Sequence, residues 1–138
     1  MTPSVLSKLQ GYLRKTLSAK SLVVRARPQK NDIADVFLGD KAVGEILVDD
    51  EDDELAYQFE MKIKEPPQPL TSQEMVRIQL FLRERFGAKT LSVRGRGKLK
   101  DSAEVFVGED SIATLSVAKD GYEFQMAILE MDLEDMDD

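Results

Sequence analysis

The feature that most constrains this chain of 138 residues is an internal repeat. Shifting the sequence by 69 positions aligns residues 6–48 with residues 75–117 without a gap. After a four-residue shortening, the match resumes with YQFEMKI at 57–63 over YEFQMAI at 122–128. Identical pairs include Gln10/Gln79, Arg14/Arg83, Leu22/Leu91, Arg25/Arg94, Arg27/Arg96 and Phe37/Phe106. A repeat of this length predicts two copies of one folding unit.

Each copy begins with a helical pattern and continues with strands. Apolar residues spaced by three or four form one stripe in each copy: Leu6, Leu9, Leu13 and Leu17, then Met75, Ile78, Leu82 and Phe86. Strand-like runs follow at about 21–28, 33–38, 42–48 and 55–63, and again at about 90–96, 102–107, 111–117 and 121–129. Gly-Asp, Gly-Glu and Asp-Gly pairs between these runs are typical of hairpin turns. The pattern predicts an α+β fold with two repeats of a helix followed by a four-stranded antiparallel meander.

The domain organisation follows from the repeat. We expect a first α-β-β-β-β repeat at 1–64, a proline-rich linker at 65–69, a second repeat at 70–129 and an acidic tail at 130–138. One unit of about 65 residues is marginally stable alone, so the copies should either share a core or extend one sheet about a pseudo-twofold axis, as a pseudodimer. Val76 and Leu80 stand where the first copy has Ser7 and Gly11. We predict that this apolar edge packs near Gly11.

Composition excludes several function classes. The chain has no cysteine and no histidine, so disulfides, thiolate chemistry and the commonest general base near neutral pH are missing. No run reaches the roughly 18 apolar residues of a membrane span, and the first residues lack a signal-peptide pattern. We therefore expect a cytoplasmic protein that binds no membrane. We predict no catalytic residues, no cofactor and no metal, since the acidic run at 49–54 lacks the spacing of a calcium loop.

Charge is unevenly distributed along the chain, although the net charge is -7. Residues 1–31 hold seven basic residues and no acidic one, whereas residues 49–54 and residues 130–138 hold six acids each. Strand alternation places the repeated arginines on the face away from the helix. These residues form our candidate surface for an anionic partner: Arg25, Arg27, Arg94, Arg96 and Lys98. In the simpler alternative they are structural, with Arg25 and Arg27 paired to Asp35 and other carboxylates and Arg94 paired to Glu104.

The orientation of Phe37 and Phe106 depends on the following turn. With a three-residue turn at Gly39, both rings face away from the helix beside Val43 and Ile112, where they can add stacking platforms. With a two-residue turn both rings enter the core, because a slip of one residue exchanges the two faces. Both alternatives are compatible with the sequence.

Some stretches carry a resemblance to a known family. The second copy reads DSAEVFVGED at 101–110 and YEFQMAILEMDLED at 122–135, and the first reads VRARPQKNDIADVFLGD at 24–40. Here the chain resembles a family of short bacterial proteins, about one unit long, known as a domain of unknown function. The resemblance covers nearly the whole chain except the linker and the last residues, and it implies no activity. Because those members carry one unit, it implies that they form homodimers which this chain imitates internally.

We interpret the chain as a non-enzymatic binding or adaptor protein that recognises a protein partner through charge-polarised surfaces, as a monomer with an internal pseudo-twofold or a weak homodimer. Two alternatives stay open. A nucleic-acid-binding module would use the arginine-bearing sheet face, although a pI near 4.7 counts against it. An acidic secretion-chaperone-like protein would need a second central helix. The tail, with Met131, Leu133 and Met136 between acids, is either a frayed end or a segment that docks on a partner or on this protein.

Overall fold

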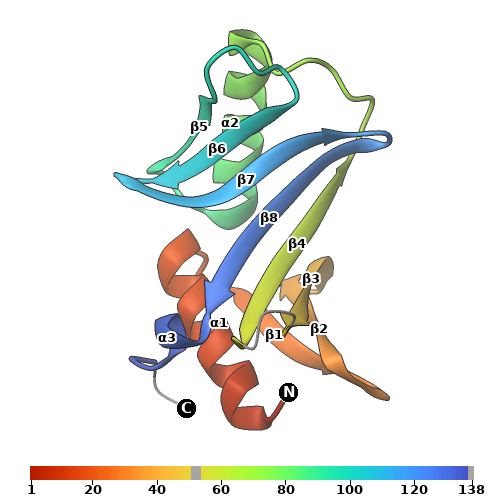
Figure 1. Ribbon diagram of the computed structural model, residues 1–138, viewed down its shortest axis with the longest axis vertical. Helices are drawn as coiled ribbons and strands as arrows, with labels where there is room; N and C mark the ends of the chain where they lie inside the picture. Colours follow the sequence, from red (N-terminus) through yellow and green to blue (C-terminus); the bar gives the residue numbers. More distant parts are fainter. Residues whose placement is uncertain (51–53, 137–138) are drawn as a thin grey trace.

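The computed structural model describes residues 1–50 and 54–136. The first unit consists of α1 (Pro3–Leu17), β1 (Leu22–Arg27), β2 (Lys30–Leu38), β3 (Lys41–Asp49) and β4 (Ala56–Lys64). The second consists of α2 (Ser72–Phe86), β5 (Leu91–Gly95), β6 (Ser102–Val107), β7 (Asp110–Ala118) and β8 (Gly121–Leu129), followed by a short helix α3 (Glu130–Leu133). The predicted α+β fold, a helix and a four-stranded antiparallel meander repeated twice, is confirmed (Figure 1).

The two meanders merge into one eight-stranded sheet. Its strand order is β1-β2-β3-β4-β8-β7-β6-β5, so the units join through β4 and β8 at the centre. These two strands pair antiparallel from Ala56 opposite Leu129 to Lys64 opposite Gly121. Glu60 and Gln125, which are equivalent in the two copies, lie directly opposite each other. The pseudo-twofold axis therefore passes between them, and the chain is a pseudodimer.

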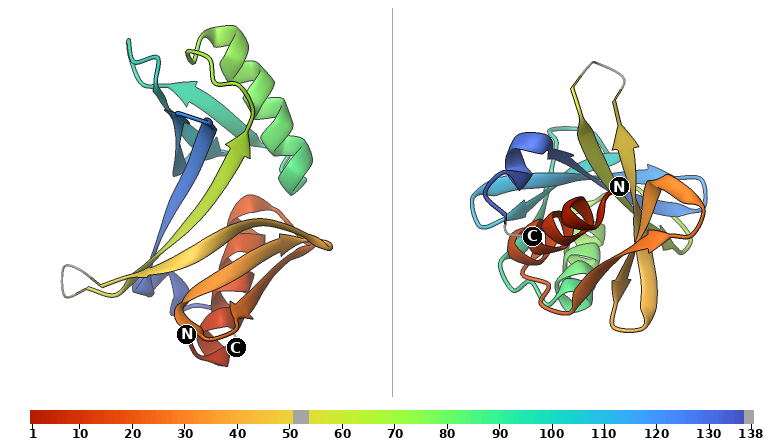
Figure 2. Two further views of the ribbon diagram at one scale, coloured as in Figure 1. Left: turned by 90° about the vertical axis from the view of Figure 1, so that its right-hand side faces the viewer. Right: turned by 90° about the horizontal axis from the view of Figure 1, so that it is seen from below.

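One hydrophobic core serves both units. Both long helices cover the same face of a strongly twisted sheet (Figure 2), and the buried residues of both units form one continuous cluster. Phe124 of β8 lies near the centre of this cluster, with its ring centroid 5.8 Å from that of Phe59 in β4 and 5.7 Å from that of Phe86 in α2. Since burying a phenylalanine contributes about 1.5–3 kcal/mol, these contacts bind one unit firmly to the other.

Local signals set the helix ends. The Thr2 hydroxyl accepts a hydrogen bond from the Val5 amide at 3.2 Å, and the Thr71 hydroxyl accepts one from the Glu74 amide at 3.3 Å. Both helices end at a residue in the left-handed conformation, Ser18 at φ 55° and Gly87 at φ 76°. The Glu74 side chain does not complete a capping box with Thr71, because it binds partners described below.

Each helix also protects an edge of the sheet. In both units a helix glutamine accepts a hydrogen bond from the edge strand, and a helix arginine donates one to it. The pairs are Val24 N to Gln10 Oε1 at 3.1 Å, Arg14 Nε to Leu22 O at 2.6 Å, Val93 N to Gln79 Oε1 at 3.0 Å and Arg83 Nε to Leu91 O at 2.6 Å. These side chains occupy backbone groups that an unprotected edge strand offers to other chains. This role accounts for two of the identical pairs in the repeat.

The predicted packing of Val76 and Leu80 near Gly11 is wrong. Val76 is 54% exposed and Leu80 is 56% exposed. The space beside Gly11 is taken by the Met136 sulfur, 3.7 Å from where a Cβ on Gly11 would lie. The two long helices instead approach each other at their C-terminal ends, where Gly87 lies beside the Ser18 carbonyl.

The first part of the acidic tail docks on the protein itself. Leu133 is 5% exposed, and Met136 reaches α1 at Gly11, whereas Met131 is 65% exposed. Residues 51–53 of the acidic run and residues 137–138 of the tail lie outside the described residues. No helix in the described part of the chain has the length and apolar character needed to cross a membrane.

Candidate anion-binding surface

The sheet face opposite α1 and α2, here called the outer face, carries a continuous row of polar side chains. One residue from each of the eight strands lies in this row, in the order Arg25, Asp35, Glu45, Glu60, Gln125, Thr114, Glu104 and Arg94. The row has an arginine at each end and carboxylates between them. The structure therefore places the repeated arginines at the two opposite edges of the sheet, and it does not gather them into one patch.

Arg27 and Arg96 are neutralised by carboxylates of neighbouring strands. Arg27 donates through Nη2 to Asp35 and, at 2.8 Å, to Glu45, and its Nε lies 3.1 Å from Asp35. The hydrogen bonds with Asp35, then with Glu45, raise the pKa of Arg27 above its usual value. Arg96 Nε lies 3.5 Å from the Glu104 carboxylate. For these two arginines the structural alternative describes the observed contacts.

Arg25 and Arg94, in contrast, each lie over a phenylalanine ring. The Arg25 guanidinium carbon lies 4.7 Å from the centre of the Phe37 ring, and that of Arg94 lies 4.0 Å from the centre of the Phe106 ring. Arg94 also donates to the Ser92 hydroxyl at 3.2 Å and to the Gly108 carbonyl at 3.3 Å. Both arginines are exposed, and neither forms an ion pair within residues 1–50 and 54–136. Within these residues the expected pairing of Arg25 with Asp35 and of Arg94 with Glu104 is absent. In each unit the carboxylate binds the arginine two positions further along the chain, Arg27 or Arg96.

Both phenylalanines lie on the outer face, for a reason that neither turn alternative contained. The turn has two residues, since Leu38 pairs with Lys41. Phe37 pairs with Ala42, but the next residue, Val36, pairs with Gly44. Val43 is therefore an extra residue, which makes a bulge in β3. The extra residue restores the alternation that the short turn would have reversed. The same bulge between β6 and β7 sets the direction of Phe106.

Lys98 lies apart from the outer face. It is exposed in the connection between β5 and β6, beyond the edge of the sheet. The five candidate residues therefore form a pair of arginines at each edge, with Lys98 beside the second pair.

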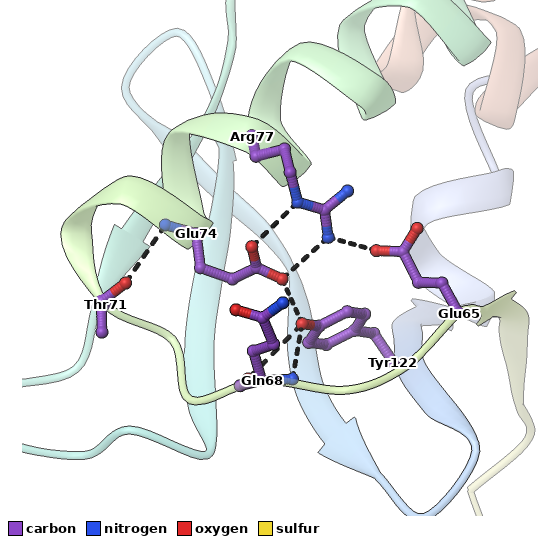
Figure 3. A network of polar contacts seen from close by, with 6 residues as sticks. All are labelled: Glu65, Gln68, Thr71, Glu74, Arg77 and Tyr122. Carbon is purple, nitrogen blue, oxygen red and sulfur yellow. Dashed lines mark hydrogen bonds and ion pairs between the residues drawn. The ribbon is translucent and has the colours of Figure 1, made fainter.

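A buried polar network at the linker was missed by the sequence reasoning (Figure 3). Glu74 is 6% exposed and accepts hydrogen bonds from Arg77 Nε at 2.8 Å, from Arg77 Nη2 at 2.7 Å and from the Tyr122 hydroxyl. Arg77 also binds Glu65, and the Tyr122 hydroxyl accepts from the Gln68 amide at 2.9 Å. The network fastens the linker to α2 and β8. The sequence feature that could have indicated this network is Glu74, which stands in the second helix where the first helix has Val5.

The network also determines the charge state of Glu74. Hydrogen bonds from Arg77 lower the pKa of Glu74 from its usual 4.5 to about 2, against the opposing effect of burial. Burial and the nearby Glu74 raise the pKa of Tyr122. At neutral pH the carboxylate is thus ionised and neutralised by Arg77, which suits a structural ion pair and not a proton donor. Among the described residues, no acidic cluster is arranged to hold a metal ion.

Comparison with known proteins agrees with the repeat. The family model described as "Protein of unknown function (DUF3126)" matches the chain twice, over residues 6–66 and residues 74–132. No curated protein and no solved structure matches the chain. The two matched segments each contain most of one long helix and all four strands that follow it.

Proposed function

We propose that this chain, which belongs to the DUF3126 family and carries two of its units in tandem, is a non-enzymatic binding protein that acts as an adaptor. Its partner is a protein surface that presents carboxylates to the outer face. The observation that carries the proposal is the pair of exposed, equivalent Arg–Phe stacks, Arg25 on Phe37 and Arg94 on Phe106.

The stacked arrangement favours recognition of a carboxylate. A guanidinium that lies over a ring is held in place, so its N–H donors lose little freedom when they bind two carboxylate oxygens. Arginines and aromatic residues are also enriched among the residues that dominate protein interfaces. Arg27 and Arg96, in contrast, already bind carboxylates of this protein. We therefore assign partner binding to Arg25 and Arg94, and an orienting role to the other two.

The carboxylates of the outer face favour a protein partner over a nucleic acid. Asp35, Glu45, Glu60 and Glu104 lie in the same row as the two stacked arginines. A phosphate backbone laid along this row would meet like charges between its two ends, which is unfavourable. A protein surface can place a carboxylate at each end and neutral or basic groups between them.

The test compares two variants with the same change in charge. One replaces the stacked arginines, Arg25→Ala with Arg94→Ala, and the control is Lys20→Ala with Lys89→Ala, which are exposed and equivalent in the two copies. The wild type and both variants, checked for folding by circular dichroism, serve as bait at low salt in a lysate of the native host, with and without nuclease treatment. Captured proteins are identified by mass spectrometry. We expect a specific partner to bind the wild type and the lysine variant but not the arginine variant. Equal capture by all three, or a partner that disappears on nuclease treatment, contradicts the proposal.

A further inference from the structure

Two short exposed segments at opposite ends of the molecule carry opposite charge, and each exposes an apolar side chain. At one end, where β8 runs into α3, Leu129 is 45% exposed and Met131 is 65% exposed. Glu130 and Asp132 flank Met131 in the chain. Within the described residues, the segments 54–59 and 126–136, which lie at this end of the central strand pair and in the tail, contain no lysine or arginine. We call Leu129, Glu130, Met131 and Asp132 the acidic end.

The connection from β5 to β6 lies at the opposite end of the long axis (Figure 1). It carries Arg96, Lys98 and Lys100, and between the lysines Leu99 is 54% exposed. Two backbone hydrogen bonds hold this connection in shape, from Leu99 N to Arg96 O at 3.2 Å and from Leu70 N to Lys100 O at 2.7 Å. We call Lys98, Leu99 and Lys100 the basic loop.

A hollow lies beside Leu99. It has a volume of about 520 Å³, and its apolar lining comes from Pro67, Pro69, Leu99 and Val117. Its polar lining consists of Lys98, Lys100, Gln68 and one acid, Asp101, so the basic residues outnumber the acidic one. Its apolar lining and its lysines are complementary to a methionine between two acids. Methionine is unbranched and polarisable, so it fills irregular apolar hollows well.

We propose that the acidic end of one copy docks on the basic loop of a second copy. Met131 enters the hollow beside Leu99, while Glu130 and Asp132 face Lys98 and Lys100. The two surfaces lie at opposite ends of one molecule, so they meet only between copies (Figure 1).

The proposed contact is heterologous, since it joins two different surfaces and leaves one of each free. Such contacts build head-to-tail assemblies, which are closed rings or open chains. The surfaces are small, so the association is weak and depends on charge, and salt reduces it because the Debye length falls from about 30 Å at 0.01 M to about 3 Å at 1 M. Self-association of this kind goes beyond the proposed adaptor function, because it uses neither Arg25 nor Phe37.

The experiment is sedimentation velocity on the full chain over a range of concentrations, at about 0.02 M and about 0.5 M salt. We expect the sedimentation coefficient of the wild type to rise with concentration at low salt only. A loop variant, Lys98→Glu with Lys100→Glu, and a tail variant, Glu130→Lys with Met131→Ser, should each associate at least about tenfold more weakly. A matched control, Lys20→Glu with Lys89→Glu, has the charge change of the loop variant and should associate like the wild type.

Mixing the variants gives the decisive result. The loop variant keeps an intact acidic end and the tail variant keeps an intact basic loop, so an equal mixture should form one-to-one dimers and nothing larger. A wild type that stays monomeric at low salt overturns the proposal, and so does a mixture that stays monomeric while both variants are folded by circular dichroism. Association that persists in both variants points to another surface, such as Val76 and Leu80, and also overturns it.

Discussion

The buried carboxylate of Glu74 makes a prediction that pH can test. A carboxyl whose pKa falls from 4.5 to about 2 on folding stabilises the folded state by at most about 3.5 kcal/mol at neutral pH, since each tenfold change in proton affinity is worth about 1.4 kcal/mol. The Arg77 side chain is 48% exposed, so water weakens the pair and we expect about 1–2 kcal/mol. Because the folded pKa is the lower one, this stability is present above pH 4.5 and is lost as the pH falls towards about 2.

The substitution that isolates the charge is Glu74→Gln, which keeps the shape and an acceptor for the Tyr122 hydroxyl. We expect it to lower the free energy of unfolding by about 1–2 kcal/mol at pH 7 and by much less at pH 2.5. The chain has no tryptophan, so urea unfolding is followed by circular dichroism. Glu84→Gln, on the exposed side of the same helix, is the control and should change stability by less than about 0.5 kcal/mol. A loss for Glu74→Gln that is equal at both pH values, or no loss at pH 7, refutes the argument.

Three further predictions follow from the packing. Replacing Gln10 and Gln79 together by alanine exposes an edge-strand amide in each unit, so we expect a loss of about 1–2 kcal/mol per site in urea unfolding and larger species in light scattering. Gly121→Ala would place a Cβ 1.9 Å from a β4 carbonyl oxygen, whereas a Cβ at Gly108 meets no atom within 4 Å. Gly108→Ala therefore adds only the strain of φ +61°, about 1–2 kcal/mol, and we expect Gly121→Ala to lower the free energy of unfolding by more. Equal urea midpoints for the two variants would contradict this. Phe124→Ala should cost about 3–5 kcal/mol and keep a single unfolding transition, since its ring contacts both units; separate transitions by circular dichroism would show that the units have separate cores.

The elements were predictable because their signals are local. The period of the apolar stripes placed both helices, and strand alternation placed the arginines on the face away from them. The way the units join was not predictable, because strands with one apolar face can extend a sheet or pack against another sheet equally well. The register of β4 against β8 belongs to tertiary structure, and no pattern within either strand specifies its partner.

The features that the sequence left open, mispredicted or did not reveal depend on contacts between residues that are distant in the sequence. The direction of Phe37 was set by a bulge in the neighbouring strand, not by turn length alone. The partner of Gly11 was the Met136 side chain from the far end of the chain, and a helix pattern cannot reveal such a contact. The role of Glu74 required Tyr122, which lies 48 positions away. In each case a contact with a residue distant in the sequence decided the result.

The repeat separates scaffold from surface in a way that supports the assignment of the stacked arginines. Among the identical pairs, Gln10/Gln79 and Arg14/Arg83 have a visible task in the fold, since each binds the backbone of an edge strand. The equivalent residues Arg25 and Arg94 bind no edge-strand backbone in this way. Both are exposed, and each lies over a phenylalanine ring that is itself repeated. At the axis, by contrast, the copies differ, and Glu60 faces Gln125 where two identical copies would place like charges directly opposite each other. The joint between the units is thus asymmetric, whereas the same exposed stack stands at both edges of the sheet.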